Sequence, residues 1–72
     1  MPDYQDQLLH VEGMSCAGCE NRVARRLGAL EGVRKVMADA RKAEVRVLFD
    51  SERVDVAAIS SAIAALGYEV RP

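Results

Sequence analysis

Two cysteines, Cys16 and Cys19, stand three positions apart in the segment Gly13-Met14-Ser15-Cys16-Ala17-Gly18-Cys19, and the chain has no others. The thiolate is the form of cysteine that binds soft metal ions and attacks disulfides. Two thiols at positions i and i+3 across the start of a helix can point to a common spot. The unpaired N–H groups and partial positive charge of a helix N-terminus favour their ionisation. The spacing therefore predicts a metal site or a redox pair.

The number of available ligands limits which metal the cysteine pair would hold. A structural zinc site needs four ligands, and an iron–sulfur cluster needs four cysteines. The single histidine, His10, is expected on the outer face of a strand, away from the core. Two thiolates suit a soft monovalent ion, which indicates copper(I), although silver(I) and mercury(II) share this softness. Such a site leaves space for another protein's thiolates, so we expect the ion to pass on by ligand exchange. No general acid or base accompanies the cysteines, so an enzyme is not expected.

The hydrophobic pattern predicts the elements that position this segment. Strands are expected over residues 5–12, 33–39, 43–49 and 68–70, and helices over residues 18–30 and 55–66. The apolar residues of the first helix, Cys19, Val23, Leu27 and Leu30, recur at steps of four, four and three. Residues 39–42 are expected to form a hairpin turn without a glycine. The order β-α-β-β-α-β predicts an α+β ferredoxin-like sandwich, in which two helices cover one face of a four-stranded antiparallel sheet.

Five residues are expected to shape the ends of these elements. Gly13 and Gly18 bracket the cysteine segment and are expected to let the backbone turn tightly around an ion. Gly32 and Gly67 each follow a predicted helix, where a glycine commonly terminates the helix. Asp55 is expected to cap the second helix.

Length, composition and charge exclude several classes of protein. A chain of 72 residues is expected to form one domain over residues 1–72. The net charge of −1 offers no general attraction for nucleic acid. No apolar run approaches the roughly 20 residues that span a membrane, so a membrane-embedded protein is not expected. Residues 1–6 are acidic and polar, unlike a signal peptide, and two close thiols suit a reducing compartment. We therefore expect a cytoplasmic protein.

Several segments resemble one known family. The cysteine segment is similar to the metal-binding loop of heavy-metal-associated domains, and the likeness covers essentially the whole chain. The other matching segments are Gly32-Val33, Val45-Arg46-Val47 and Leu66-Gly67-Tyr68-Glu69-Val70. The chain resembles the CopZ-like bacterial copper chaperones of this family, and also the amino-terminal domains of copper-transporting P-type ATPases.

The resemblance implies a role for each residue of the motif. Cys16 and Cys19 would bind copper(I), and Met14 would pack beneath the loop without binding the metal. Ser15 matches the copper-type loop, since zinc-type relatives often carry aspartate there. Tyr68 falls in a loop near the metal, where it would shield the thiolates or donate a hydrogen bond to them. The alternative for Tyr68 is a simple cap on the sheet edge.

A basic cluster follows the cysteines on the first helix. Arg22, Arg25 and Arg26 could form an ordinary solvated face, or they could steer an acidic partner toward the metal. The resemblance names a copper-transporting P-type ATPase as that partner. It leaves three other functions open: a regulatory domain of such an ATPase, a mercury(II) carrier and a thiol–disulfide enzyme. We expect a monomer without metal, and exposed cysteines would allow two copies to share one ion.

Overall fold

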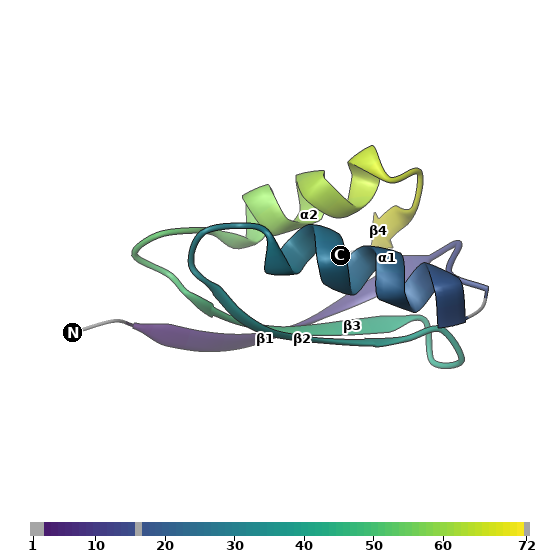
Figure 1. Ribbon diagram of the computed structural model, residues 1–72, viewed down its shortest axis with the longest axis horizontal. Coiled ribbons are helices and arrows are strands. Elements are labelled where there is room, and N and C mark those ends of the chain that lie inside the picture. Colours follow the sequence, from purple (N-terminus) through teal and green to yellow (C-terminus); the bar gives the residue numbers. More distant parts are fainter. Residues whose placement is uncertain (1–2, 16, 72) are drawn as a thin grey trace.

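The architecture is that of a two-layer sandwich, seen in a computed structural model that describes residues 3–15 and 17–71 (Figure 1). Within these residues the elements are β1 (Tyr4–Glu12), α1 (Ala17–Gly28), β2 (Val33–Asp39), β3 (Glu44–Asp50), α2 (Val56–Ala65) and β4 (Glu69–Arg71). The sheet has the order β2-β3-β1-β4, and each neighbouring pair is antiparallel. Both helices lie on the same face of the sheet. The predicted ferredoxin-like fold is confirmed.

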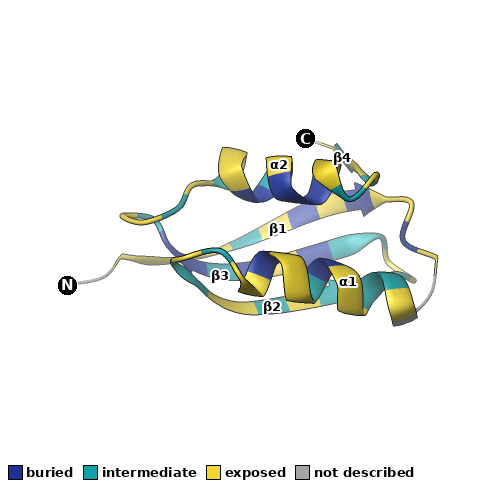
Figure 2. Cartoon of the chain, turned by 45° about the horizontal axis from the view of Figure 1, so that its top comes forward, coloured by how far each residue is buried: buried dark blue, intermediate teal, exposed yellow. Residues whose placement is uncertain are grey.

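The core lies between the sheet and the two helices. On the central strands, alternate side chains point inward, as the period-two pattern predicts. Figure 2 shows buried residues on β1, on β3 and on both helices. The buried apolar side chains are Leu9, Val11, Met14, Val23, Leu27, Val45, Val47, Phe49, Ile59, Ala62 and Ile63. Phe49 is thus the one aromatic residue in this set of buried side chains.

In strand β2, the residues that face the core do not follow the usual spacing of two. Val33 pairs with Phe49, and Lys35 pairs with Leu48, so Arg34 is an extra residue in the ladder. This β-bulge shifts the alternation by one position. Val33 and Val36 therefore both pack against the core, although they are three residues apart. The inward pattern of β2 could not be read from spacing alone.

The ends of the helices differ slightly from the prediction. Helix α1 runs over Ala17–Gly28, whereas 18–30 was expected. Asp55 caps α2 as predicted, because its Oδ1 accepts a hydrogen bond of 2.8 Å from the N–H of Ala58. Gly67 has a φ of +97° after the end of α2, which confirms its role as the terminating glycine.

The prediction that Gly32 terminates the first helix is wrong. Helix α1 ends at Gly28, and Gly32 lies further along, just before β2. Its φ is +99°, and its carbonyl accepts a hydrogen bond of 2.7 Å from the N–H of Asp50. A β-carbon at Gly32 would stand 2.8 Å from the β-carbon of Arg53. This glycine is therefore required by the close approach of the segment after β3, a contact between distant parts of the chain.

The turn between β2 and β3 forms without a glycine, as expected. Oδ1 of Asp39 accepts hydrogen bonds from the N–H groups of Arg41 and Lys42, at 3.0 and 3.3 Å. Ala43 completes the turn with a φ of 54°, a value that among the described non-glycine residues occurs only here. The side chain of Asp39 thus supplies the local bonds that hold the turn. No helix in residues 3–15 and 17–71 is long and apolar enough to cross a membrane.

Candidate metal centre

The cysteine segment joins β1 to α1 at one end of the sandwich, where the β2–β3 turn also lies (Figure 1). Strand β1 ends at Glu12, and Gly13 turns the chain with a φ of +106°. Helix α1 begins at Ala17, directly after Cys16, which lies outside the described residues. Gly18 is not part of the turn that was predicted to surround the ion, because it already lies in the first turn of α1. The helix thus starts earlier than its apolar stripe suggested.

Cys19 lies in the first turn of α1, partly buried, and packs against the hydrophobic core. Its Sγ is 4.0 Å from Oγ of Ser15, so the segment before the helix folds back beside this thiol. The remaining N–H groups and the dipole at a helix N-terminus favour a thiolate at this position. The thiol of Cys19 therefore lies at the edge of the core, at the N-terminal end of α1.

Tyr68 comes to the same place from the segment between α2 and β4. Its ring lies over Gly13, because a β-carbon at Gly13 would be 3.1 Å from the ring atom Cδ1. The pKa of the Tyr68 hydroxyl is raised above its usual value, mainly by a hydrogen bond with Cys19 and less by desolvation. Arg22 acts in the opposite direction, since its charge and its hydrogen bond lower the pKa of Tyr68. The fold thus brings together the phenol of Tyr68, the thiol of Cys19 and the guanidinium of Arg22.

Met14, in the cysteine segment, is buried in the core. Its side chain is 7% exposed and belongs to the hydrophobic core. A long apolar side chain in a core fills irregular space. The burial favours the interpretation of Met14 as a packing residue over that of a thioether ligand.

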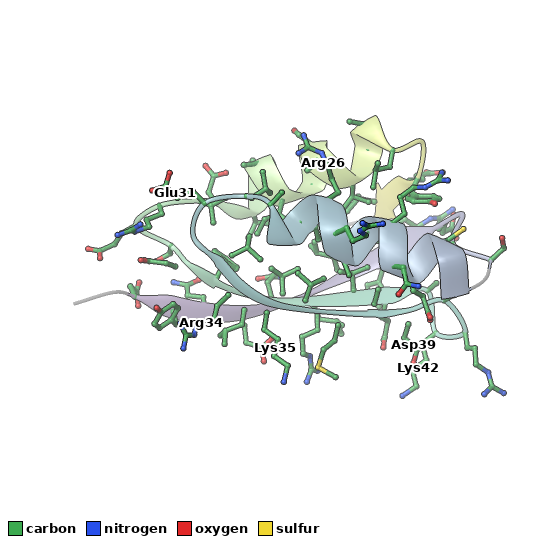
Figure 3. All side chains as sticks on the ribbon, in the orientation of Figure 1. Arg26, Glu31, Arg34, Lys35, Asp39 and Lys42 are labelled. Carbon is green, nitrogen blue, oxygen red and sulfur yellow. The ribbon has the colours of Figure 1, made fainter. Side chains whose placement is uncertain are left out.

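The arginines of α1 lie beside the site and are exposed. Arg22, Arg25 and Arg26 line a hollow of about 460 Å³, together with Gly18, Asn21 and Leu66. Figure 3 shows that Arg26 reaches from α1 toward α2. The hollow therefore lies between the two helices, with cationic groups on one wall and Leu66 on the other. Its charge suits an acidic surface.

His10 lies away from the cysteine segment, on the outer face of the sheet. It is exposed and pairs with Glu44 on β3 and with Arg71 on β4. Within residues 3–15 and 17–71, no group of three or more His, Cys, Asp or Glu side chains could hold a metal ion. A four-ligand site of the zinc type is therefore not formed by the described part of the chain.

Glu20 is a residue of this region whose contact the sequence does not reveal. Its Oε2 accepts a hydrogen bond of 2.6 Å from the N–H of Ala40, in the turn between β2 and β3. The sequence places Glu20 off the apolar stripe of α1, and no local rule connects it with a residue twenty positions away. Only the packing of α1 on the sheet creates this contact.

Comparisons with known proteins identify the class of this small thiol-bearing sandwich. The model of the heavy-metal-associated domain matches residues 8–69, so the chain belongs to the heavy-metal-associated domain family. A copper chaperone CopZ from Staphylococcus haemolyticus is 41% identical over 66 residues, which cover 92% of this chain and 97% of the relative. A copper chaperone CopZ from Bacillus subtilis is 39% identical over 66 residues, which cover 92% of this chain and 96% of the relative.

Solved structures of several kinds of protein share the fold. A CopZ metallochaperone superimposes with a TM-score of 0.91 at 33% identity, over 93% of this chain and all of the other. A copper-binding domain from the P-type ATPase HMA7 gives a TM-score of 0.88 at 30% identity, over 92% of this chain and 89% of that domain. Oxidized MerP from Ralstonia metallidurans gives 0.89 at 30% identity, over 96% of both chains. The fold is therefore common to free carriers and to domains of transporters.

Proposed function

We propose that this chain is a copper(I) chaperone, a single domain over residues 1–72 that binds one ion through the thiolates of Cys16 and Cys19. It would carry the ion in the cytoplasm to a copper-transporting P-type ATPase. The observation that carries the proposal is the pair of soft donors: two cysteines three positions apart in the sequence, of which Cys19 lies in the first turn of α1. Two soft donors suit copper(I), and the names of the relatives support this choice.

The proposed transfer is an exchange of ligands without a change in oxidation state. A thiolate of the partner forms a bond to copper(I), and one bond from copper(I) to Cys16 or Cys19 then breaks. The second pair of bonds exchanges in the same way. Each entering thiol releases a proton, and each departing thiolate takes one up. The proposal assigns no catalytic residue, because the bonds exchange directly between the two proteins.

The neighbours of Cys19 suit this chemistry. The positive charge of Arg22 favours a nearby thiolate, and the Tyr68 hydroxyl forms a hydrogen bond with Cys19. Tyr68 also covers one side of the segment by lying over Gly13. The hollow lined by Arg22, Arg25 and Arg26 provides a place for an acidic surface of the partner, beside the thiols.

The first test is a competition titration of the reduced protein with copper(I) against a chromogenic chelator. We expect one tightly bound ion per chain, and we expect Cys16→Ser or Cys19→Ser to abolish tight binding while the circular dichroism spectrum stays unchanged. Zinc(II) run in parallel should bind far more weakly. A double Cys→Ser variant that still competes with the chelator would show that the assignment is wrong.

Two alternative functions are a carrier of mercury(II) and a domain of an ATPase. Mercury(II) is an alternative cargo because it shares the softness of copper(I), and the similarity to the copper-binding domain of HMA7 supports a domain of an ATPase. The same titration with mercury(II) distinguishes a mercury carrier from a copper chaperone, since a carrier of mercury would bind mercury(II) more tightly than copper(I). Transfer of copper(I) to a separately purified ATPase domain, measured by isotope or chelator readout, supports the chaperone function.

The metal-free chain is proposed to be a monomer, and two chains could share one copper(I) ion through their four thiolates. Sedimentation at increasing ratios of copper(I) to protein tests this proposal. A rise in mass that requires copper(I) and disappears in Cys19→Ser is the expected result. A dimer that forms equally well without metal would contradict it.

A further inference from the structure

The turn between β2 and β3 is bonded to both sides of the cysteine segment. The N–H of Val11, near the end of β1, donates to the carbonyl of Ala43 at 2.8 Å. The N–H of Ala40 donates to Oε2 of Glu20 at 2.6 Å, in the first turns of α1. Val11 precedes the segment and Glu20 directly follows Cys19. One short turn therefore holds the strand that enters the segment and the helix that leaves it.

The turn is well suited to act as a fixed reference. Asp39 accepts two hydrogen bonds from backbone N–H groups within it, and the N–H of Ala43 donates to the carbonyl of Ala40 at 3.3 Å. It also leads into β3, in which Val45 and Val47 are fully buried. A contact with this turn thus connects α1 to a strand that is paired on both sides and buried in the core.

We propose that Glu20 is a positioning residue of the metal site: its hydrogen bond to Ala40 fixes the first turns of α1, and with them the thiol of Cys19, relative to β1. The inference rests on the proposed binding of copper(I) by the cysteine pair. Ligands that are held in place before the ion arrives bind it more tightly, because less conformational freedom is lost on binding. The role requires the reach of Glu20 and its acceptor oxygen, and it does not require the negative charge.

Two substitutions separate reach from charge. Glu20→Gln removes the charge but keeps an oxygen at the same distance from the main chain. Glu20→Asp keeps the charge but shortens the side chain by one methylene group, so that the carboxylate no longer reaches Ala40. Asp55→Ala is the matched control, because Asp55 also accepts a hydrogen bond from a backbone N–H, at the start of α2 and away from the cysteines.

The experiment measures copper(I) affinity by competition with a chromogenic chelator, together with hydrogen exchange of the Ala40 amide. We expect Glu20→Asp to weaken the affinity about tenfold and to speed exchange at Ala40, as is usual when a residue that orients a ligand is lost. Glu20→Gln should stay close to the unchanged protein in both measurements. Asp55→Ala should lower the thermal midpoint but leave the affinity unchanged.

Three results would overturn the inference. One is an unchanged affinity in Glu20→Asp, and another is an equal change in Glu20→Gln and Glu20→Asp. The third is a loss of affinity in Asp55→Ala as large as in Glu20→Asp, because general destabilisation would then explain the effect. A failure of the proposed function looks different, since the unchanged protein itself would not bind copper(I) tightly.

Discussion

The ring of Tyr68 lies directly over Gly13. A β-carbon at Gly13 would stand 3.1 Å from Cδ1 of the Tyr68 ring and 3.7 Å from the Cα of Tyr68. The two residues come from opposite ends of the chain, Gly13 after β1 and Tyr68 before β4. Strands β1 and β4 are hydrogen-bonded neighbours, and this pairing brings the two segments together. The absence of a side chain at Gly13 thus makes room for the phenol that forms a hydrogen bond with Cys19.

Gly13→Ala is expected to disturb both the turn and the place of Tyr68. The φ of +106° disfavours any residue with a β-carbon, and we expect the free energy of unfolding to fall by about 1–2 kcal/mol. The ring must also shift, which should change the near-ultraviolet circular dichroism of tyrosine. Urea unfolding measures the first effect.

Gly28→Ala is the matched control for this substitution. Gly28 ends α1, and a β-carbon there would meet nothing within 4 Å. The free energy of unfolding of the Gly28→Ala variant should stay the same or rise by about 0.5–1 kcal/mol, because alanine favours the helix. Equal effects of the two substitutions would show that the contact with Tyr68 and the positive φ are unimportant.

The titration of Tyr68 is expected to report on its neighbours. Because its pKa is raised in the folded chain, the protonated form is favoured, and the resulting stabilisation is present below the ordinary tyrosine pKa near 10. It is lost as the pH rises through the raised value. The difference in absorbance at 295 nm between the unchanged protein and Tyr68→Phe isolates this hydroxyl from Tyr4. Neutral pH should therefore leave the phenol able to donate a hydrogen bond.

Two variants are expected to move the pKa of Tyr68 in opposite directions. Cys19→Ala removes the largest cause of the shift, so the pKa of Tyr68 should fall toward its ordinary value. Arg22→Gln removes the group that lowers this pKa, so the pKa should rise further. Movement in the opposite direction in either variant would contradict the arrangement of the three side chains.

Reversing the charge on α1 is expected to slow transfer of copper(I) to an acidic partner. In the double variant Arg22→Glu and Arg26→Glu, the rate should fall by about tenfold or more at low ionic strength, and its dependence on salt should weaken. Affinity for copper(I) should change little by comparison. Stopped-flow measurement of transfer to an ATPase metal-binding domain gives the rate.

Lys35→Glu with Lys42→Glu is the control for the arginine pair, because it changes the net charge by the same amount. Both lysines are exposed and point away from the helices, on the other side of the sheet (Figure 3). Transfer by this control should stay close to that of the unchanged protein. If both double variants slow transfer equally, the net charge of the chain would explain the effect and docking at α1 would not.

Asp55→Ala is expected to lower the free energy of unfolding by about 1 kcal/mol, as the loss of a helix cap usually does. The carboxylate of Asp55 accepts from the N–H of Ala58, which would otherwise have no partner in the first turn of α2. Asp55→Asn should retain most of the stability, because asparagine also caps helices well. Urea denaturation that gives the same midpoint for all three proteins would refute this role of Asp55.

The sequence alone was sufficient to predict the order of the elements, the apolar stripe of α1 and the Asp55 cap. It also predicted that Cys19 lies at the start of a helix, which the structure confirms. Each of these features depends on residues a few positions apart. Val45, Val47 and Phe49, for example, are spaced by two, which is the period at which side chains of a strand point to the same face. Properties of this kind are local, so they can be read along the chain.

Only the tertiary structure decided how distant residues meet. Four features show this: the bulge at Arg34, the hydrogen bond from Ala40 to Glu20, the approach of Arg53 to Gly32 and the position of Tyr68 over Gly13. Each of them involves residues from two different segments of the chain. Such contacts depend on the register of strands and the seating of helices on the core, and no spacing in the sequence records them. The motif therefore indicated where the thiols lie, and the packing determined which side chains surround Cys19.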